Sequence, residues 1–313
     1  MKQNKPNILK HWFFVITIML IFGLTTGETL FSKQKEVDPA YLAKIKEWQQ
    51  KRLEGLKAKD SWLSLAGLFW LKEGKNTFGS DAANDLILTD VKAPARIGSF
   101  ILENGKVRFL SAQGEIVMHG SKVIFEMALK NDTEGKPTIL SSGTLSWFII
   151  KRGDCLGVRV RDSAHLRIDK LKKIDSFPID TDWRVEAVLE RFEKPRMIKV
   201  PNVLGMENDS PAPGVLVFKI NGKIHRLTPL GGAGNLFLIF GDETNTAETY
   251  GGGRFLSVKK TDDKGRTVID FNMAVNPPCA FSPFATCPLP PKTNQLSIRV
   301  TAGEKIPHGV EGH

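Results

Sequence analysis

Apolar residues between Asp38 and Lys59 recur about every three to four positions, which is the spacing of one face of an α-helix. The apolar positions are Leu42, Ile45, Trp48, Leu53 and Leu56, with lysines and glutamines among the residues between them. Asp38 can cap the first turn, and the proline at position 39 suits the first helical position because it has no N–H to satisfy. The sequence therefore predicts a helix over residues 38–59 that packs one apolar stripe against the rest of the protein.

From Trp62 onward the pattern changes to short apolar runs, rich in β-branched and aromatic residues, which are separated by turn signals. In the first half we predict strands within residues 62–71, 86–90, 96–102, 106–111, 122–129, 145–152 and 156–162. Short strands at this spacing are typical of a β-sandwich or barrel and not of alternating strands and helices.

Residues 177–192 connect this half to a second series of strands. Asn221-Gly222 lies between two apolar runs and predicts a tight hairpin. The predicted strands of this half are 215–222, 223–230, 235–242, 253–260, 266–274 and 295–302. We therefore expect a mostly β fold with an N-terminal helix (38–59), a β-sandwich domain (60–175), a second β domain built as a sheet or barrel (176–307) and a short tail (308–313).

The first residues predict export. Lys2, Lys5 and Lys10 precede an apolar run of thirteen residues, 12–24, and this combination is typical of a secretory signal peptide. The run is shorter than the roughly 20 apolar residues that cross a bilayer. We expect a signal peptide over residues 1–27 and a periplasmic or extracellular protein, with an uncleaved membrane anchor as the alternative.

The charge pattern excludes one class of partner. The whole chain carries a formal charge of +10, and removal of residues 1–27 lowers it to +7. The remaining basic residues are mixed with acidic ones, whereas a nucleic-acid-binding protein gathers them on one surface. We expect a small molecule or another protein as the partner, no nucleic acid, and membrane contact only through an uncleaved signal segment.

Familiar catalytic and cofactor motifs are absent from the sequence. It has no phosphate-binding glycine loop, no G-x-S-x-G nucleophile motif and no H-E-x-x-H zinc motif. Its six histidines never stand at metal-ligand spacing. We therefore expect no cofactor and no metal.

Two of the three cysteines, Cys279 and Cys287, stand eight residues apart in the proline-rich segment 276–291. An oxidising compartment outside the cytoplasm favours a disulfide between them, provided that their Cα atoms come within about 7 Å. Two unpaired structural thiols, or a metal site completed by other ligands, are the alternatives. The third cysteine, Cys155, is expected to be a small buried residue.

Polar residues gather in the second half of the sequence. Asp270 and Asn272 alternate with apolar residues on a predicted strand, so their side chains would share one face. Arg254 begins the preceding strand after three glycines, which let the backbone approach another group closely. Tyr250 stands just before these glycines, and Asp242 ends another predicted strand.

One interpretation of these residues is a polar pocket. The ligand-binding residues would be Tyr250, Arg254, Asn272 and Asn276. Arg254 would bind a carboxylate, a phosphate or a sugar hydroxyl, and Asp242 or Asp270 would act as a general base or as a hydrogen-bond acceptor. The other interpretation is architectural: Arg254 pairs with Asp270, and the asparagines hold loop backbone in place.

The second half contains three distinctive sequence motifs: TYGGGRFLSV at 249–258, VIDFNMAVNPPCAFSPFATCPLPP at 268–291 and TAGEK at 301–305. They resemble a group of bacterial and archaeal proteins known as domain-of-unknown-function family 1684. The resemblance extends over roughly residues 48–307. The resemblance implies that these residues share the fold of that family, and it does not imply a reaction.

A stretch of the first half, EGKNTFGSDAANDLILTD at 73–90, is similar to the start of forkhead-associated β-sandwiches, which bind phosphothreonine. Those domains carry arginine after a glycine and a Ser-x-x-His loop. Here Ser80 follows Gly79, and residues 94–97 are Pro-Ala-Arg-Ile. The resemblance therefore implies a sandwich of this shape used as a scaffold.

Two functional hypotheses follow. The first is an exported, non-catalytic protein that binds a ligand or partner through its β scaffold. The second is a periplasmic hydrolase that acts on a glycan, ester or phosphate substrate with Asp242 or Asp270 and Arg254. The sequence shows no recognisable nucleophile, so it leaves open whether the protein is an enzyme.

Overall fold

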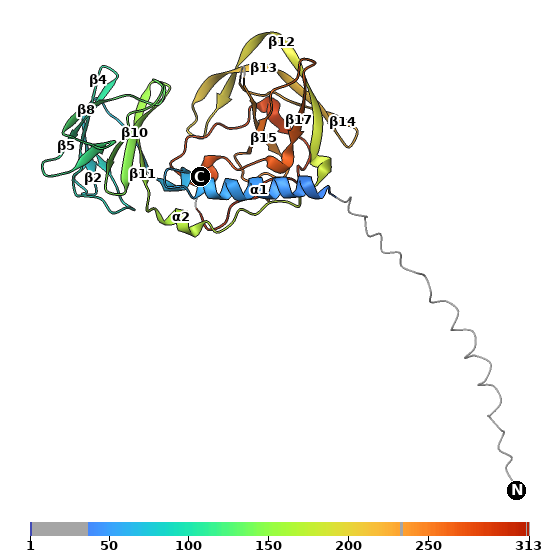
Figure 1. The fold of residues 1–313 in the computed structure, drawn as a ribbon, viewed down its shortest axis with the longest axis horizontal. Coiled ribbons are helices and arrows are strands. Elements are labelled where there is room, and N and C mark those ends of the chain that lie inside the picture. Colours follow the sequence, from blue (N-terminus) through green and yellow to red (C-terminus); the bar gives the residue numbers. More distant parts are fainter. Residues whose placement is uncertain (2–36, 232–233, 311, 313) are drawn as a thin grey trace. The chain divides into compact units, whose positions relative to one another are not determined.

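The computed structural model describes Met1 and residues 37–313, apart from residues 232–233, 311 and 313, and this part of the chain is mostly β (Figure 1). Except for Met1, the predicted signal peptide lies outside the described residues. Within the described part, no helix is long and apolar enough to cross a membrane.

Helix α1 (Pro39–Leu56) begins where the sequence predicts it. The Asp38 carboxylate accepts a hydrogen bond from the N–H of Ala40 at 3.0 Å, which caps the first turn. The buried residues of the helix are Ile45 and Leu56. The predicted N-terminal helix is confirmed.

Two sheets pack face to face in the first half. The six-stranded sheet has the order β1 (Leu65–Trp70), β11 (Cys155–Asp162), β10 (Leu145–Arg152), β9 (Leu140–Ser142), β6 (Val117–His119) and β7 (Lys122–Ile124). The five-stranded sheet has the order β3 (Leu86–Ile87), β2 (Gly74–Gly79), β4 (Gly98–Glu103), β5 (Lys106–Ser111) and β8 (Glu126–Leu129). The predicted β-sandwich is therefore present.

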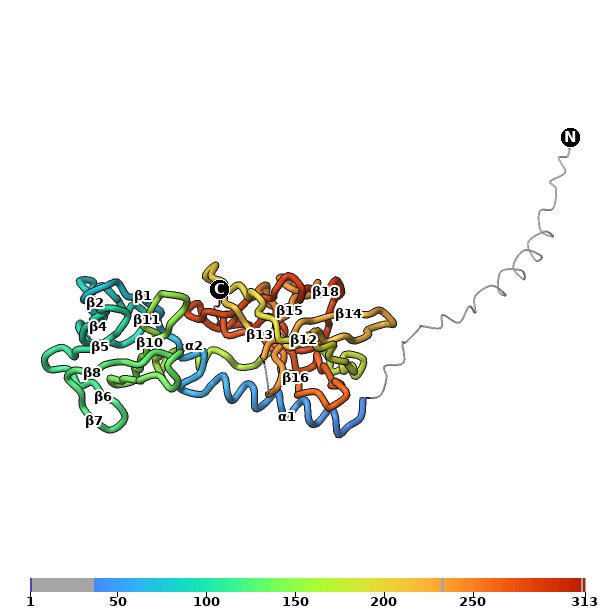
Figure 2. The backbone as a smooth tube through the Cα atoms, turned by 90° about the horizontal axis from the view of Figure 1, so that it is seen from above, coloured from blue at the N-terminus to red at the C-terminus, as the bar shows by residue number. Residues whose placement is uncertain are grey.

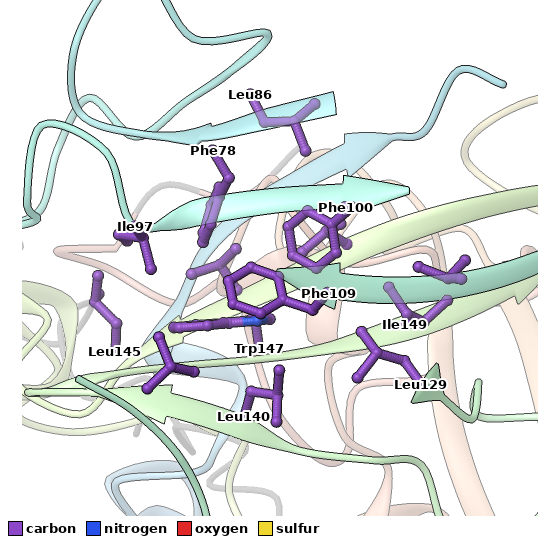
Figure 3. Close-up of a cluster of buried hydrophobic side chains, with 14 of the residues drawn as sticks. Phe78, Leu86, Ile97, Phe100, Phe109, Leu129, Leu140, Leu145, Trp147 and Ile149 are labelled. Atoms are coloured by element: carbon purple, nitrogen blue, oxygen red, sulfur yellow. The ribbon is translucent and has the colours of Figure 1, made fainter. Parts of the chain in front are cut away.

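Aromatic rings fill the space between these two sheets (Figure 3). Phe78 from β2 meets Trp147 from β10 with ring centroids 5.4 Å apart and planes at 67°. Phe109 from β5 lies at the same 5.4 Å from Trp147. The first pair meets edge to face and the second is tilted at 51°, and both contacts join the two sheets.

The second half contains two further sheets and its own core. One sheet has the order β14 (Lys223–Leu227), β13 (Glu207–Ile220), β12 (Arg184–Pro201) and β17 (Arg266–Asp270). The first three of these strands are labelled in Figure 2. The other has the order β16 (Arg254–Val258), β15 (Leu236–Asp242) and β18 (Gln295–Leu296). Phe218 and Ile269 of the first sheet share a buried cluster with Leu238 and Phe240 of the second.

Short helical segments complete the described part of the chain. They are α2 (Leu166–Lys170) and the 3-10 turns η1 (Trp62–Ser64), η2 (Thr181–Trp183), η3 (Phe271–Met273), η4 (Pro278–Ala280) and η5 (Lys292–Asn294). Residues 37–313 cluster as one compact unit. The boundary near residue 175 therefore stays a prediction.

The hairpin at Asn221-Gly222 is confirmed. Asn221 and Gly222 have φ values of 49° and 76°, the left-handed geometry that a two-residue turn of this type requires. The connecting segment was predicted less well, because most of it, from Arg184 onward, belongs to strand β12.

Several predicted strands are shorter than expected, among them β3, β14, β17 and β18, and the last two have a clear cause. Strand β17 ends at Asp270, whose carboxylate accepts the N–H of Asn272 at 3.2 Å and begins the turn η3. Strand β18 contains only Gln295 and Leu296. Beyond it, the backbone of Val300 bonds to buried side chains instead of extending the sheet.

Replacing Trp147 by alanine is expected to lower the free energy of unfolding by about 3–5 kcal/mol, because the fully buried indole would leave a cavity among packed rings. Phe125 is 79% exposed, so Phe125→Ala should change it by less than about 0.5 kcal/mol. Urea denaturation followed by circular dichroism measures both variants. Equal losses at the two positions would show that the aromatic cluster is not a stabilising core.

Candidate functional site

Arg254 and Asp242 form an ion pair sealed from solvent. Their side chains are both 0% exposed, and Arg254 Nη2 lies 2.6 Å from Asp242 Oδ2. Arg254 also donates to the carbonyl oxygens of Val300, at 2.9 Å, and of Ala302. Burial lowers the pKa of Arg254, and the Asp242 carboxylate opposes that shift. The guanidinium therefore ties two chain segments together and offers no open face to a ligand.

The partner of Arg254 differs from the one that the architectural interpretation predicted. Asp242, at the end of β15, takes the place expected for Asp270. Its second oxygen, Oδ1, accepts hydrogen bonds from the N–H and hydroxyl of Thr244 at 2.8 and 2.6 Å. Both oxygens of this carboxylate are thus occupied by protein donors.

Position 253, the last of the three glycines before Arg254, must be glycine for steric reasons. Its φ is +81°, and a Cβ at this position would lie 2.5 Å from the side chain of Pro290 and 2.6 Å from the carbonyl oxygen of Phe240. Tyr250, at the start of the run, is partly buried beside the cysteine-containing loop, and burial raises the pKa of its hydroxyl. These residues pack the proline-rich segment against β15 and β16.

Asp270 and Asn272 hold the first turn of α1. The hydroxyl of Tyr41 lies 3.0 and 3.1 Å from the two carboxylate oxygens of Asp270, and Asn272 Nδ2 donates to that hydroxyl at 3.0 Å. Asn272 Nδ2 also donates to the carbonyl of Asp180 at 2.7 Å. The pKa of Tyr41 is raised, first by burial and then by the Asp270 charge.

The expected common face of Asp270 and Asn272 is wrong, because the chain leaves the strand between them. Asp270 is the last residue of β17, and Asn272 lies in η3 with 2% exposure. The period of two that puts alternate side chains on one face holds only while the strand continues.

Asn276 belongs to a third network around Glu304, a residue that the sequence analysis did not select. Glu304 is 3% exposed and accepts hydrogen bonds from Arg52 Nε at 3.1 Å and from the N–H of Asn276 at 2.7 Å. Asn276 Nδ2 donates to the carbonyl of Lys305 at 2.7 Å. Burial raises the pKa of Glu304, and the Arg52 charge opposes that shift.

Cys279 and Cys287 are both free thiols, so the predicted disulfide is absent from this structure. The two residues are nevertheless close, since each sulfur accepts the backbone N–H of the other residue, at 3.0 and 3.2 Å. Cys155 is exposed as the first residue of β11, directly after the turn, so its expected burial is wrong.

A groove that the sequence analysis missed lies on the outer face of the sheet formed by β14, β13, β12 and β17. Its volume is about 750 Å³. Val188 and Val217 are cross-strand partners at its centre, and Ile224 and Val268 extend the apolar surface. The charged residues that line it are Glu186, Glu190, Lys219 and Arg266.

The groove has a weak sequence signal. On β12 the core-facing residues alternate with outward ones, and Val188 stands at an outward position between Glu186 and Glu190, where it is 47% exposed. Ile224 is 60% exposed on the edge strand β14. Apolar residues at solvent positions of adjoining strands mark an interaction surface, but the register that joins them cannot be read from each strand alone.

The candidate residues from the sequence therefore lie in separate buried networks and not in one pocket. Arg254 and Asp242 form one, Asp270 and Asn272 another, and Asn276 the third. In the described part of the chain, no three histidine, cysteine, aspartate or glutamate residues are placed to hold a metal ion. The ligand-binding and catalytic roles of these residues stay predictions.

Comparison with known proteins finds one family model, described as protein of unknown function (DUF1684), which matches residues 169–305. A search of curated proteins finds no match. Among solved structures, the chain is similar to an uncharacterized protein of Haloarcula marismortui determined by solution NMR, with 30% identity over 44% of this chain and 78% of that one and a TM-score of 0.38. The resemblance to forkhead-associated sandwiches is not confirmed.

Arg254→Met is expected to lower the free energy of unfolding by about 3–5 kcal/mol, because it leaves the Asp242 carboxylate buried without its counter-ion. Arg299→Met is the matched control. Its ion pair with Glu248 is partly exposed, at 53% and 32%, so the expected loss is at most about 1 kcal/mol. Guanidinium denaturation of the two variants gives the comparison, and a small loss at Arg254 would refute its role as an anchor.

Glu304→Gln should change how stability depends on pH. Because burial raises the pKa of Glu304 in the folded state above its ordinary 4.5, the folded protein holds the proton more tightly than the unfolded chain. The stabilisation from this group is then complete at pH values below the ordinary pKa, and it is lost as the pH rises through the raised pKa of the folded state. Relative to the variant, the wild type should lose stability from about pH 4.5 upward, as measured by urea denaturation at several pH values. A difference that stays constant with pH would contradict the shift.

Proposed function

The chain belongs to the family of proteins of unknown function DUF1684, and we propose that it is an exported, non-catalytic protein that binds a small, largely apolar molecule in the groove of its β14–β13–β12–β17 sheet. The basic and apolar pattern of residues 1–27 supports export to the periplasm or the cell exterior.

The groove itself carries this proposal. Its volume of about 750 Å³ lies within the range of roughly 300–1,000 Å³ that is usual for small-molecule sites. Such sites combine apolar walls with a few polar groups that orient the ligand. The valine pair at the centre and the charged residues around it have this composition.

The charged residues indicate the kind of molecule. Glu186 and Glu190 lie on β12, whereas Lys219 and Arg266 lie on the strands to either side. An apolar ligand with a polar or charged end could place its body over Val188 and Val217 and pair its end with a side chain of opposite charge. Ionised groups at a partly exposed site contribute more to orientation than to affinity.

Hydrolysis has less support than binding. Asp242 is sealed and fully bonded, and Asp270 already accepts hydrogen bonds from Tyr41 and Asn272. A general base needs a free lone pair within reach of a substrate proton. The groove, in turn, is lined by residue types that can act as nucleophiles, but Glu190 is paired with Arg226, and the Thr267 hydroxyl donates to a backbone carbonyl.

Titration with the fluorescent apolar anion 1-anilinonaphthalene-8-sulfonate tests the groove. We expect Val188→Asp to weaken binding of this probe by about tenfold, because a carboxylate would then be buried beneath its apolar rings. Val188 is 47% exposed, so the substitution should leave the fold intact, which circular dichroism can verify.

Val123→Asp is the matched control, since Val123 is 51% exposed on the edge strand β7 of the other half. It should leave the affinity for the probe unchanged. If Val123→Asp weakens binding and Val188→Asp does not, the groove is not the site, and the exposed apolar residues near β7 become the candidate instead.

A further inference from the structure

The two thiols of the proline-rich loop face each other in a closed apolar setting. Cys279 is 0% exposed and Cys287 4% exposed. The N–H of Cys279 donates to Cys287 Sγ at 3.0 Å, and the N–H of Cys287 donates to Cys279 Sγ at 3.2 Å. Backbone N–H groups aimed at sulfur favour the ionised form of a thiol, because they stabilise negative charge.

Arg159 supplies an unusual positive charge near this pair. Its side chain lies on β11, is 3% exposed and donates through Nη2 to Thr286 Oγ1 at 3.1 Å, one residue before Cys287. Among the described residues, no carboxylate lies within ion-pair distance of it, and its Nε has no hydrogen-bond partner. Arg254 is buried equally deeply but has a carboxylate and two carbonyls.

A buried guanidinium without a counter-ion is strongly destabilising, so an anion close to Arg159 would be stabilised in return. The thiol pair is the neighbouring group that can become one. The charge of Arg159 acts on both sulfurs and favours their ionised forms. The pKa of Cys279 is lowered, first by a hydrogen bond from the Cys287 thiol, while the same bond raises the pKa of Cys287. Ionisation of the pair would therefore place the negative charge on Cys279.

We propose that Cys279 and Cys287 form a two-cysteine reaction site for small hydroperoxides, in which Cys279 is the attacking thiolate, Cys287 is the resolving thiol and Arg159 is a positioning residue that balances the charge. The pair reacts once and is then oxidised, so this reaction is stoichiometric and agrees with a non-catalytic protein. It is separate from ligand binding in the groove, which lies on other strands.

The reaction uses two electrons from the thiol pair. The Cys279 thiolate attacks one oxygen of the hydroperoxide, an S–O bond forms, the O–O bond breaks, and the departing oxygen takes the Cys287 proton to leave as an alcohol or water. Cys287, now a thiolate, attacks the sulfenic sulfur of Cys279. An S–S bond forms, and the hydroxide that leaves takes a proton from solvent to become water.

The burial of Cys279 determines which reagents can reach its sulfur. Hydrogen peroxide is close to water in size and needs little opening to reach a sulfur with 0% exposure, whereas a bulky maleimide needs the loop to unfold. Cys155 is exposed and should show the opposite preference, because a bulky maleimide reaches it without any opening of the fold. The chain therefore contains its own reference thiol.

The test uses the full chain carrying Cys155→Ser, treated with hydrogen peroxide and analysed by intact mass and by maleimide labelling after denaturation. We expect both remaining thiols to be lost together with a mass decrease of about 2 Da, and a thiol reductant to restore them. In the Cys155→Ser, Cys287→Ser double variant, the reaction should stop at a sulfenic acid on Cys279 that dimedone traps. Peroxide treatment that leaves Cys279 and Cys287 reduced, while Cys155 of the wild type is oxidised, would overturn the proposal.

The role of Arg159 is tested by the rate of peroxide oxidation as a function of pH. Arg159→Met should slow the reaction by about tenfold at neutral pH and move the midpoint of the pH profile upward, and Arg159→Lys should restore part of the rate. Arg152→Met is the matched control, since Arg152 also donates to Thr286 but is paired with Asp132 at 2.8 Å. It should leave the profile unchanged.

If Arg159→Met does not fold, the Cys155→Ser protein alone decides the question. Its rate profile should have a midpoint below the ordinary thiol value of about 8.5. A midpoint at or above that value, or equal effects of Arg159→Met and Arg152→Met, would show that the buried guanidinium does not act on the thiols.

Discussion

The ion pair between Arg254 and Asp242 determines how the C-terminal part of the chain is arranged. A guanidinium with no exposure is stable only if a carboxylate and several hydrogen-bond acceptors surround it. Here the acceptors are the backbone carbonyls of Val300 and Ala302, so this segment must bend toward β15 and β16. That requirement explains why strand β18 stops after two residues. It also places Glu304, two residues further on, against α1.

The other buried polar networks follow from the same constraint. Loops do not take part in the hydrogen-bond ladder of a sheet, so their backbone N–H and C=O groups need other partners once they are buried. Asn272 and Asn276 provide these partners for the loops at 180 and 305, and Asn294 does so for Thr228 and Ile239. The asparagines of the distinctive motifs in the second half therefore serve to hydrogen-bond irregular backbone.

The sequence predicted those features that depend on neighbouring residues. The cap at Asp38, the hairpin at Asn221-Gly222 and the strand-rich first half all have local signals, and all are present. Partners across the fold could not be predicted in this way. Arg254 has a choice between Asp242 and Asp270, which lie at similar separations along the chain, and only the tertiary register decides between them. The groove was missed for the same reason, because its valines meet only when β12 and β13 pair.

The contacts of helix α1 bear on the order in which parts of the protein fold. Its first turn is held by Asp270, 229 residues later than Tyr41, and its C-terminal half by Glu304, 252 residues later than Arg52. Chain closure over such distances is slow compared with helix formation, which takes less than about a microsecond once the segment is free. The earliest element of the fold to be synthesised is thus among the last to find its place, and until then its apolar stripe must stay exposed. A chaperone or a translocation partner that covers an amphipathic helix would be most useful during that interval.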